Sequence, residues 1–110
     1  MISTHILDTS LGKPAAHVTV ELAKYVNDQW LDISIDKTNQ DGRISFECAP
    51  IGGTYRLKFK IEDYLKQQSK ENAEPFFIVA PVVFNISDTT RKYHIPLLLN
   101  PFGYSIYRGS

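Results

Sequence analysis

The 110-residue chain is poor in cysteine, and its one cysteine, Cys48, excludes an internal disulfide and a zinc site built from several cysteines. Because the stretch ISFECAP gives this thiol no cationic neighbour, we expect it to be buried and inert. The first residues, MISTHILDTS, lack the basic and apolar regions of a signal peptide. No apolar run reaches the roughly 18 residues of a membrane-spanning helix. We therefore expect a cytoplasmic protein without a membrane partner, or a periplasmic one if a signal peptide has been removed.

An excess of charge of one sign is also absent. The 12 Lys and Arg residues balance the 12 Asp and Glu residues, so the formal net charge is zero. Such a chain has no general attraction to polyanions, and we expect no nucleic-acid partner. A net charge near zero does little to oppose self-association, which favours an oligomer.

Several catalytic motifs are missing. The sequence has no glycine-rich phosphate loop and no dinucleotide fingerprint. The histidines at positions 5, 17 and 94 do not have the spacing of metal ligands, and GYSIYRG lacks the G-x-S-x-G pattern of a nucleophile elbow. The acidic residues are scattered, so no pair of catalytic carboxylates is visible. The histidine spacing therefore does not favour a metal site.

Alternation of apolar and polar residues is the dominant pattern, and it predicts half-buried strands of antiparallel sheets. The clearest segments are HVTVEL, WLDISID and TYRLKFKI. The residues expected to share a face within each segment are Val18, Val20 and Leu22; Leu31, Ile33 and Ile35; and Tyr55, Leu57, Phe59 and Ile61. We place His17 at a solvent-facing strand position.

One polar segment without glycine or proline predicts a short helix from about Glu62 to Lys70. Pro81 interrupts the apolar stretch that follows, which indicates an edge strand, a bulge or a strand start. With turn signals between the strands, the count is seven or eight strands and one helix. This pattern predicts an all-β protein, a β-sandwich formed by residues 1–110 as a single domain.

The segment RKYHIPLLL combines an apolar strand with a histidine. Tyr93, Ile95, Leu97 and Leu99 are expected on one face, and His94, Pro96 and Leu98 on the other. A strand that is apolar on both faces is usually covered on both sides. In a two-layer sandwich the second cover must come from another subunit, so we expect this strand near a subunit interface.

Three basic side chains, His5, Arg43 and His94, are the candidates for chemistry. Their positions alone leave two interpretations open: ordinary surface or hydrogen-bonded residues, or members of one shared site. The same choice applies to the last four residues, YRGS, which are either the edge of a sheet or part of a site.

Four blocks, STHILDTSLGKPA, TNQDGRI, YHIPLLLNPFGY and the terminal YRGS, resemble the transthyretin-related family, and within it the 5-hydroxyisourate hydrolases. The resemblance extends from His5 to Ser110. It implies a transthyretin-like sandwich of two four-stranded antiparallel sheets with one short helix. It further implies a homotetramer, a dimer of dimers, with its sites in a central channel. The implied reaction is the hydrolysis of 5-hydroxyisourate to 2-oxo-4-hydroxy-4-carboxy-5-ureidoimidazoline in urate degradation, without a cofactor.

The resemblance also implies roles for individual residues. The residues implied in catalysis are His5, Arg43, His94 and Ser110. The residues implied in substrate binding are His5, Arg43, Tyr107, Arg108 and Gly109. We expect the two histidines to share acid and base duty and Arg43 to offset developing negative charge.

Two other functions stay open at this point. One is a transthyretin-like carrier that binds a small aromatic ligand without turnover. The other is a structural or adhesion sandwich, which would have no cluster of basic residues.

Overall fold

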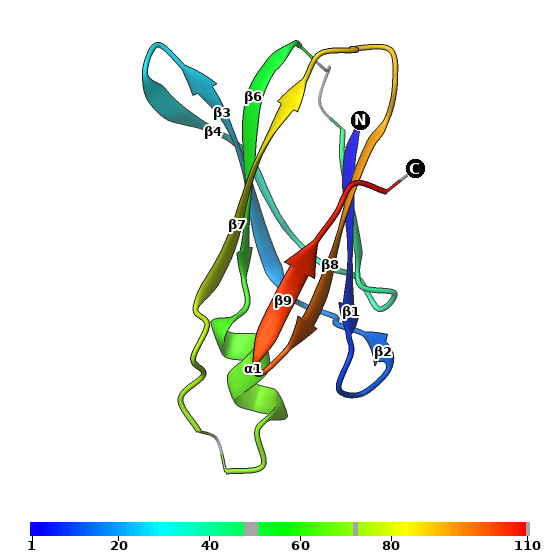
Figure 1. Cartoon of the computed structure of the whole chain (residues 1–110), viewed down its shortest axis with the longest axis vertical. Coiled ribbons are helices and arrows are strands. Elements are labelled where there is room, and N and C mark those ends of the chain that lie inside the picture. The colour runs from blue at the N-terminus through cyan, green and yellow to red at the C-terminus, as the bar shows by residue number, and fades with distance from the viewer. Residues whose placement is uncertain (48–50, 72, 110) are drawn as a thin grey trace.

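The computed structural model describes residues 1–47, 51–71 and 73–109, so Cys48 and Ser110 lie outside the described residues. Two β-sheets pack face to face, and a short helix lies at one end of the sandwich (Figure 1). In chain order the elements are β1 (Ile2–Asp8), β2 (Lys13–Pro14), β3 (Thr19–Val26), β4 (Gln29–Lys37), β5 (Arg43–Phe46), β6 (Gly53–Lys60), α1 (Glu62–Gln68), β7 (Val79–Ile86), β8 (Tyr93–Asn100) and β9 (Gly103–Ile106).

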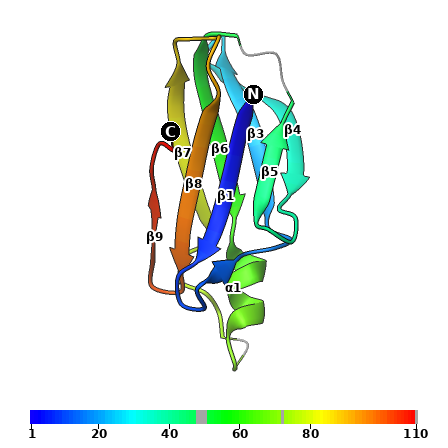
Figure 2. The ribbon, with the colours of Figure 1, turned by 90° about the vertical axis from the view of Figure 1, so that its right-hand side faces the viewer.

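The two sheets have the orders β2–β1–β8–β9, with β5 also paired to β1, and β4–β3–β6–β7. Strands β1 and β8 are parallel, whereas the other pairs are antiparallel. Figure 2 shows β9, β8, β1 and β5 side by side. The predicted transthyretin-like β-sandwich with a short helix is confirmed. Among the described residues, the first sheet has a fifth member, the two-residue strand β2, beyond the four expected.

The core lies between the sheets and is filled by the alternating residues of β1, β3, β6 and β8. The inward faces predicted for Val18 to Leu22, for Tyr55 to Ile61 and for Tyr93 to Leu99 are confirmed, because all of the named apolar members are buried. Each fully buried aliphatic or aromatic side chain contributes about 1.5–3 kcal/mol. The alternate residues of these strands point away from the core, so the core does not depend on their side chains.

Strand β4 differs from the prediction that Leu31, Ile33 and Ile35 share one half-buried face. Leu31 is 58% exposed and Ile35 is 61% exposed. The register against β3 skips Ile33, which is the extra residue of a β-bulge. An extra residue reverses the alternation, so Leu31 and Ile35 lie on opposite faces. In addition, β4 is an edge strand, and its hairpin with β3 leans away from the other sheet (Figure 1).

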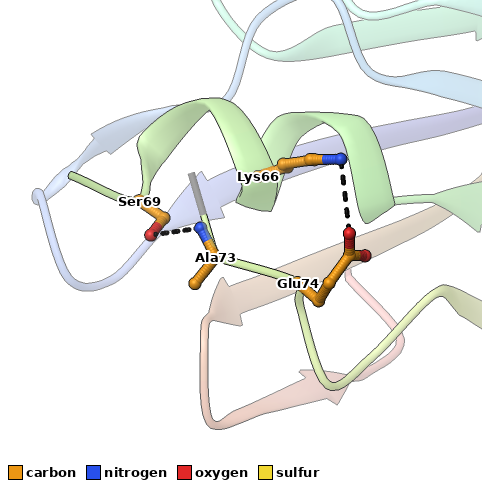
Figure 3. Close-up of polar contacts among 4 residues, drawn as sticks. All are labelled: Lys66, Ser69, Ala73 and Glu74. Carbon is orange, nitrogen blue, oxygen red and sulfur yellow. Dashed lines mark hydrogen bonds and ion pairs between the residues drawn. The ribbon is translucent and has the colours of Figure 1, made fainter. Parts of the chain in front are cut away.

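The helix begins where predicted, at Glu62, and ends two residues earlier than predicted, at Gln68. Acidic residues in its first turn favour the helix N-terminus. Beyond its end, the Ser69 hydroxyl accepts a hydrogen bond from the N–H of Ala73 at 3.1 Å, and Lys66 forms an ion pair with Glu74 at 3.5 Å (Figure 3). A serine that bonds the backbone in this way offers an alternative to a further helical turn.

Pro81 lies within β7, an edge strand of its sheet, where a missing N–H costs little. The edge position predicted for this proline is therefore confirmed. Asn27 and Asp28, which supply the turn signal between β3 and β4, both have positive φ, as a two-residue hairpin turn of type I′ requires. Among the described residues, no helix combines the length and the apolar character needed to cross a bilayer.

Asp8, at the end of β1, is buried and connects this strand to α1. Its Oδ1 accepts the N–H groups of Ser10 and Leu11 at 3.0 and 3.1 Å, and its Oδ2 accepts the Tyr64 hydroxyl at 2.6 Å. Burial alone would raise the pKa of Asp8, but the hydrogen bonds from Ser10, Tyr64 and Leu11 outweigh burial, so its pKa lies below the ordinary value. Burial and the contact with Asp8 raise the pKa of Tyr64.

We predict that Tyr64→Phe lowers the free energy of unfolding by about 1–3 kcal/mol, because a buried carboxylate oxygen loses its donor. Urea titration at pH 7 measures the change. Tyr25→Phe is the control: it removes a hydroxyl that is exposed and has no hydrogen-bond partner among the described residues. Because the folded state holds the pKa of Asp8 below its unfolded value, its contribution is present above about pH 4 and is lost as the pH falls. This loss should be smaller in Tyr64→Phe, and equal stability of variant and parent would contradict the assignment.

Candidate active site

The register of β1 against its two neighbours brings the three predicted basic residues to one face. His5 lies opposite Arg43 of β5 on one side and opposite Pro96 of β8 on the other. His94 lies opposite Ser3. Because paired residues point to the same side of a sheet, these side chains share the outer face, away from the core. The two histidines are half-buried and Arg43 is exposed.

The turn before β5 places Arg43 beside His5. The side-chain Oδ1 of Asn39 accepts the N–H groups of Asp41 and Arg43 at 2.9 and 3.0 Å. Gly42 has a φ of 73°, and a Cβ at this position would lie 2.6 Å from the carbonyl oxygen of Ile6. The turn therefore needs glycine for two reasons, its positive φ and its close approach to β1.

The C-terminal tail continues along the free edge of β8. The N–H of Tyr107 donates to the carbonyl of Pro96 at 3.4 Å, and the N–H of Gly109 donates to the carbonyl of His94 at 2.8 Å. Gly109 and His94 form a β-bridge. These backbone hydrogen bonds extend the sheet through Gly109, and they place the tail beside His94, a candidate catalytic residue. Ser110, which was also implied in catalysis, follows outside the described residues.

The Arg108 side chain lies over the ring of Tyr93. Its guanidinium carbon lies 5.5 Å from the centre of the Tyr93 ring, within the range of a cation–π contact. Tyr107 is 53% exposed. A cavity of about 270 Å³ opens beside the tail, and its lining consists of Val82, Phe84, Asn85, Tyr93, His94, Ile95, Ile106, Tyr107 and Arg108.

Contacts on two sides hold the imidazole of His94. Its Nδ1 is hydrogen-bonded to the Ser3 hydroxyl at 2.8 Å. On the other edge of the ring, a Cβ on Gly109 would lie only 2.7 Å from Cδ2 of His94, so this residue has to be glycine for the tail to pass. The sequence reasoning missed Ser3. The only signal for it was its position two residues before His5, on the same face of the strand.

The surroundings lower the pKa of both histidines, which favours their neutral forms at pH 7. Burial lowers the pKa of His5, and the charge of Arg43 lowers it further, while Asp41 acts in the opposite direction. Burial also lowers the pKa of His94, with contributions from Arg43 and then His5. These mutual effects mean that the three groups lie within range of one another's charges. In the part of the chain that the structure describes, Arg43 forms no ion pair.

His17, the third histidine, stands apart from the site. It is exposed, as predicted, but it precedes β3 instead of lying in the strand. Its φ is 64°, and its Nε2 lies 3.3 Å from the amide nitrogen of Gln40. Within residues 1–47, 51–71 and 73–109, no group of three or more His, Cys, Asp and Glu side chains is placed to hold a metal ion.

The arrangement suits acid–base chemistry on a carbonyl compound. A neutral imidazole can take a proton from water near neutral pH. A guanidinium presents a planar set of donors to a carbonyl or to an oxyanion. Residues on paired strands are held in fixed geometry, which catalysis requires.

The chain is similar to known proteins over nearly its whole length. The sequence profile of the "HIUase/Transthyretin family" matches residues 2–109. A 5-hydroxyisourate hydrolase of Halalkalibacterium halodurans is 44% identical over 115 residues, which cover 99% of this chain and 97% of that protein.

Among solved structures, 5-hydroxyisourate hydrolase of Klebsiella pneumoniae is similar with a TM-score of 0.84 and 36% identity, covering 99% of this chain and 97% of that one. Sea bream transthyretin in complex with thyroxine is similar with a TM-score of 0.87 and 30% identity, covering 98% and 93%. The chain belongs to the HIUase/Transthyretin family.

Proposed function

We propose that this chain is a hydrolase that opens the ring of 5-hydroxyisourate to form 2-oxo-4-hydroxy-4-carboxy-5-ureidoimidazoline, a step of urate degradation. The observation that carries the proposal is the cluster of His5, Arg43 and His94 on one outer face, where burial and Arg43 lower the pKa of both histidines. The names of similar proteins support it, because a relative 44% identical over nearly the whole chain is a 5-hydroxyisourate hydrolase.

The reaction is the hydrolysis of a cyclic amide. One histidine accepts a proton from water while the water oxygen forms a bond to the ring carbonyl carbon. Arg43 stabilises the negative charge that develops on the carbonyl oxygen. The carbon–nitrogen bond then breaks, and the other histidine supplies the proton that the leaving nitrogen needs. No step requires a metal or an organic cofactor.

The tail contributes to the same site in this proposal. Tyr107, Gly109 and the Ser110 hydroxyl bind the substrate or the attacking water. Arg108 contributes less directly to substrate binding, because its guanidinium lies over the Tyr93 ring. The cavity beside the tail has a largely apolar lining, which does not match a small polar ring. We therefore place the substrate over the outer face, between Arg43 and His94.

We further propose that residues 1–110 act as one domain in a homotetramer, a dimer of dimers. Leu98, on the outer face of β8, is only half-buried within one chain, and a second subunit that closes a channel over this face would cover it. We place the protein in the cytoplasm, without nucleic-acid or membrane partners, because its charge is balanced and its single cysteine requires no oxidising compartment.

The alternative is a carrier that binds a small aromatic ligand without turnover. The similarity to a transthyretin in complex with thyroxine favours it at the level of the fold. A carrier has no need for two neutral histidines beside an arginine, or for a tail held against one of them. The same cluster argues against a purely structural sandwich.

We predict that the protein accelerates the decay of 5-hydroxyisourate generated in situ by urate oxidase, followed spectroscopically. His94→Ala should lower kcat by about 10²–10⁴-fold if the residue acts as a general acid or base. His17→Ala, at an exposed histidine outside the cluster, should leave kcat unchanged.

Light scattering on the same samples should give about 50 kDa, four chains of 12.5 kDa, for every variant. A folded tetramer that leaves the decay at background would favour the carrier, and His94→Ala with near-normal kcat would remove that residue from the mechanism.

We also predict that Gly109→Ala lowers kcat at least about tenfold, because the new Cβ must displace the His94 ring or the tail, and small displacements of a catalytic group are costly. Gly103→Ala is the matched control, since a Cβ there meets nothing within 4 Å. Both rates come from the same decay assay. Equal activity of the two variants would show that the close contact does not matter.

The pH dependence follows from the direction of the pKa shifts. Because the pKa values of His5 and His94 are lowered, both remain neutral at pH 7, and kcat/KM should fall only below about pH 6.5. Arg43→Gln removes one of the charges responsible, so the acid limb should move to higher pH while the rate falls. Lys70→Gln removes a charge beyond α1 and should leave the limb in place. An acid limb that does not move in Arg43→Gln would contradict this coupling.

A further inference from the structure

Ser3 is the one polar partner of the His94 side chain among the described residues. The two residues lie opposite each other in the parallel ladder of β1 and β8, and the distance from Oγ to Nδ1 is 2.8 Å. Ser3 is half-buried, and its backbone is fixed within a seven-residue strand. The hydrogen bond is therefore set by the fold and does not depend on a mobile loop.

We propose that Ser3 is a positioning residue of the hydrolase, which accepts a hydrogen bond from Nδ1–H of His94 and so leaves Nε2 as the unprotonated nitrogen that takes the proton from water. This inference rests on the proposed function. It adds a residue that neither the sequence patterns nor the resemblance pointed to.

The geometry of the ring supports this assignment. Nδ1 is occupied by Ser3, and the Cδ2 edge is packed against Gly109. Nε2 is then the only ring nitrogen left to meet a substrate. A hydroxyl can donate or accept, but a base at Nε2 requires that the neutral ring carry its proton at Nδ1.

The chemistry of a hydroxyl also fits the surroundings. A carboxylate at this position would orient the ring equally well, but it would favour the imidazolium. Burial, and then the charges of Arg43 and of protonated His5, already act against a positive charge on His94 and lower its pKa. A neutral acceptor fixes the tautomer without opposing that effect, so the ring stays a base.

The neighbouring strand supplies a matched control. Ser45 of β5 lies opposite Ser3 on the same outer face and makes no hydrogen bond to His94 in the described structure. Ser3→Ala and Ser45→Ala each remove one hydroxyl from adjacent positions of the ladder. Ser3→Thr keeps the hydroxyl and adds a methyl group that a strand tolerates well.

The first measurement is the protonation pattern of the ring, by long-range proton–nitrogen NMR of the whole protein at pH 8. We expect the parent protein, Ser3→Thr and Ser45→Ala to carry the proton of His94 on Nδ1. In Ser3→Ala the ring should become a mixture of tautomers. A parent protein with the proton on Nε2, or a Ser3→Ala variant with an unchanged tautomer, would overturn the proposal.

The second measurement is the rate of 5-hydroxyisourate decay. Ser3→Ala should lower kcat by about tenfold with little change in KM, the size expected for one neutral hydrogen bond, while Ser3→Thr and Ser45→Ala stay near the parent value. Normal kcat in Ser3→Ala overturns the role of Ser3. If no variant and no parent protein hydrolyses the substrate, the proposed function fails, and the NMR result still decides whether Ser3 fixes the tautomer.

Discussion

The parallel pairing of β1 with β8 is the constraint on which the site depends. It joins residues 91 positions apart, and a buried hydrogen bond from the Thr4 hydroxyl to the carbonyl of Ile95, 2.6 Å long, lies within it. Side chains alternate along both strands, so the register that buries Thr4 also directs Ser3 and His5 outward, next to His94. A slip of one residue would turn the candidate site into the core and the core into solvent. Packing of the apolar core therefore fixes the register of β1 and β8, and this register fixes the relative positions of the polar side chains on the opposite face.

His94 is constrained through its main chain as well as through its ring. Its carbonyl accepts the N–H of Gly109, and its ring lies between Ser3 and the same glycine. A single residue thus ties the first strand, the eighth strand and the tail together. Burial and the positive charge of Arg43 lower the pKa of His94, which favours the neutral ring. Ser3 and Gly109 hold the orientation of the ring, whereas burial and Arg43 lower its pKa.

Local patterns were sufficient for much of the fold. Alternation identified the inward faces of β3, β6 and β8, and the polar segment beginning at Glu62 identified the helix. The pattern failed at Ile33, because a β-bulge reverses alternation without leaving a mark in the sequence. Ser3 escaped notice for a related reason: its role exists only in the register with a strand at the other end of the chain. His5, Arg43 and His94 were identified because the sequence blocks around them resemble a known family.

The fold alone does not decide between a hydrolase and a ligand-binding carrier. The structure is about equally similar to a hydrolase and to a thyroxine-bound transthyretin, with TM-scores of 0.84 and 0.87. The difference must therefore lie in side chains that the sandwich does not need for stability, which are the outward positions of β1, β5 and β8. Gly109 adds a steric condition, because the tail can reach His94 only where no Cβ intervenes. The scaffold fixes where these few groups lie, and their chemical identity determines whether a bound ring is held or opened.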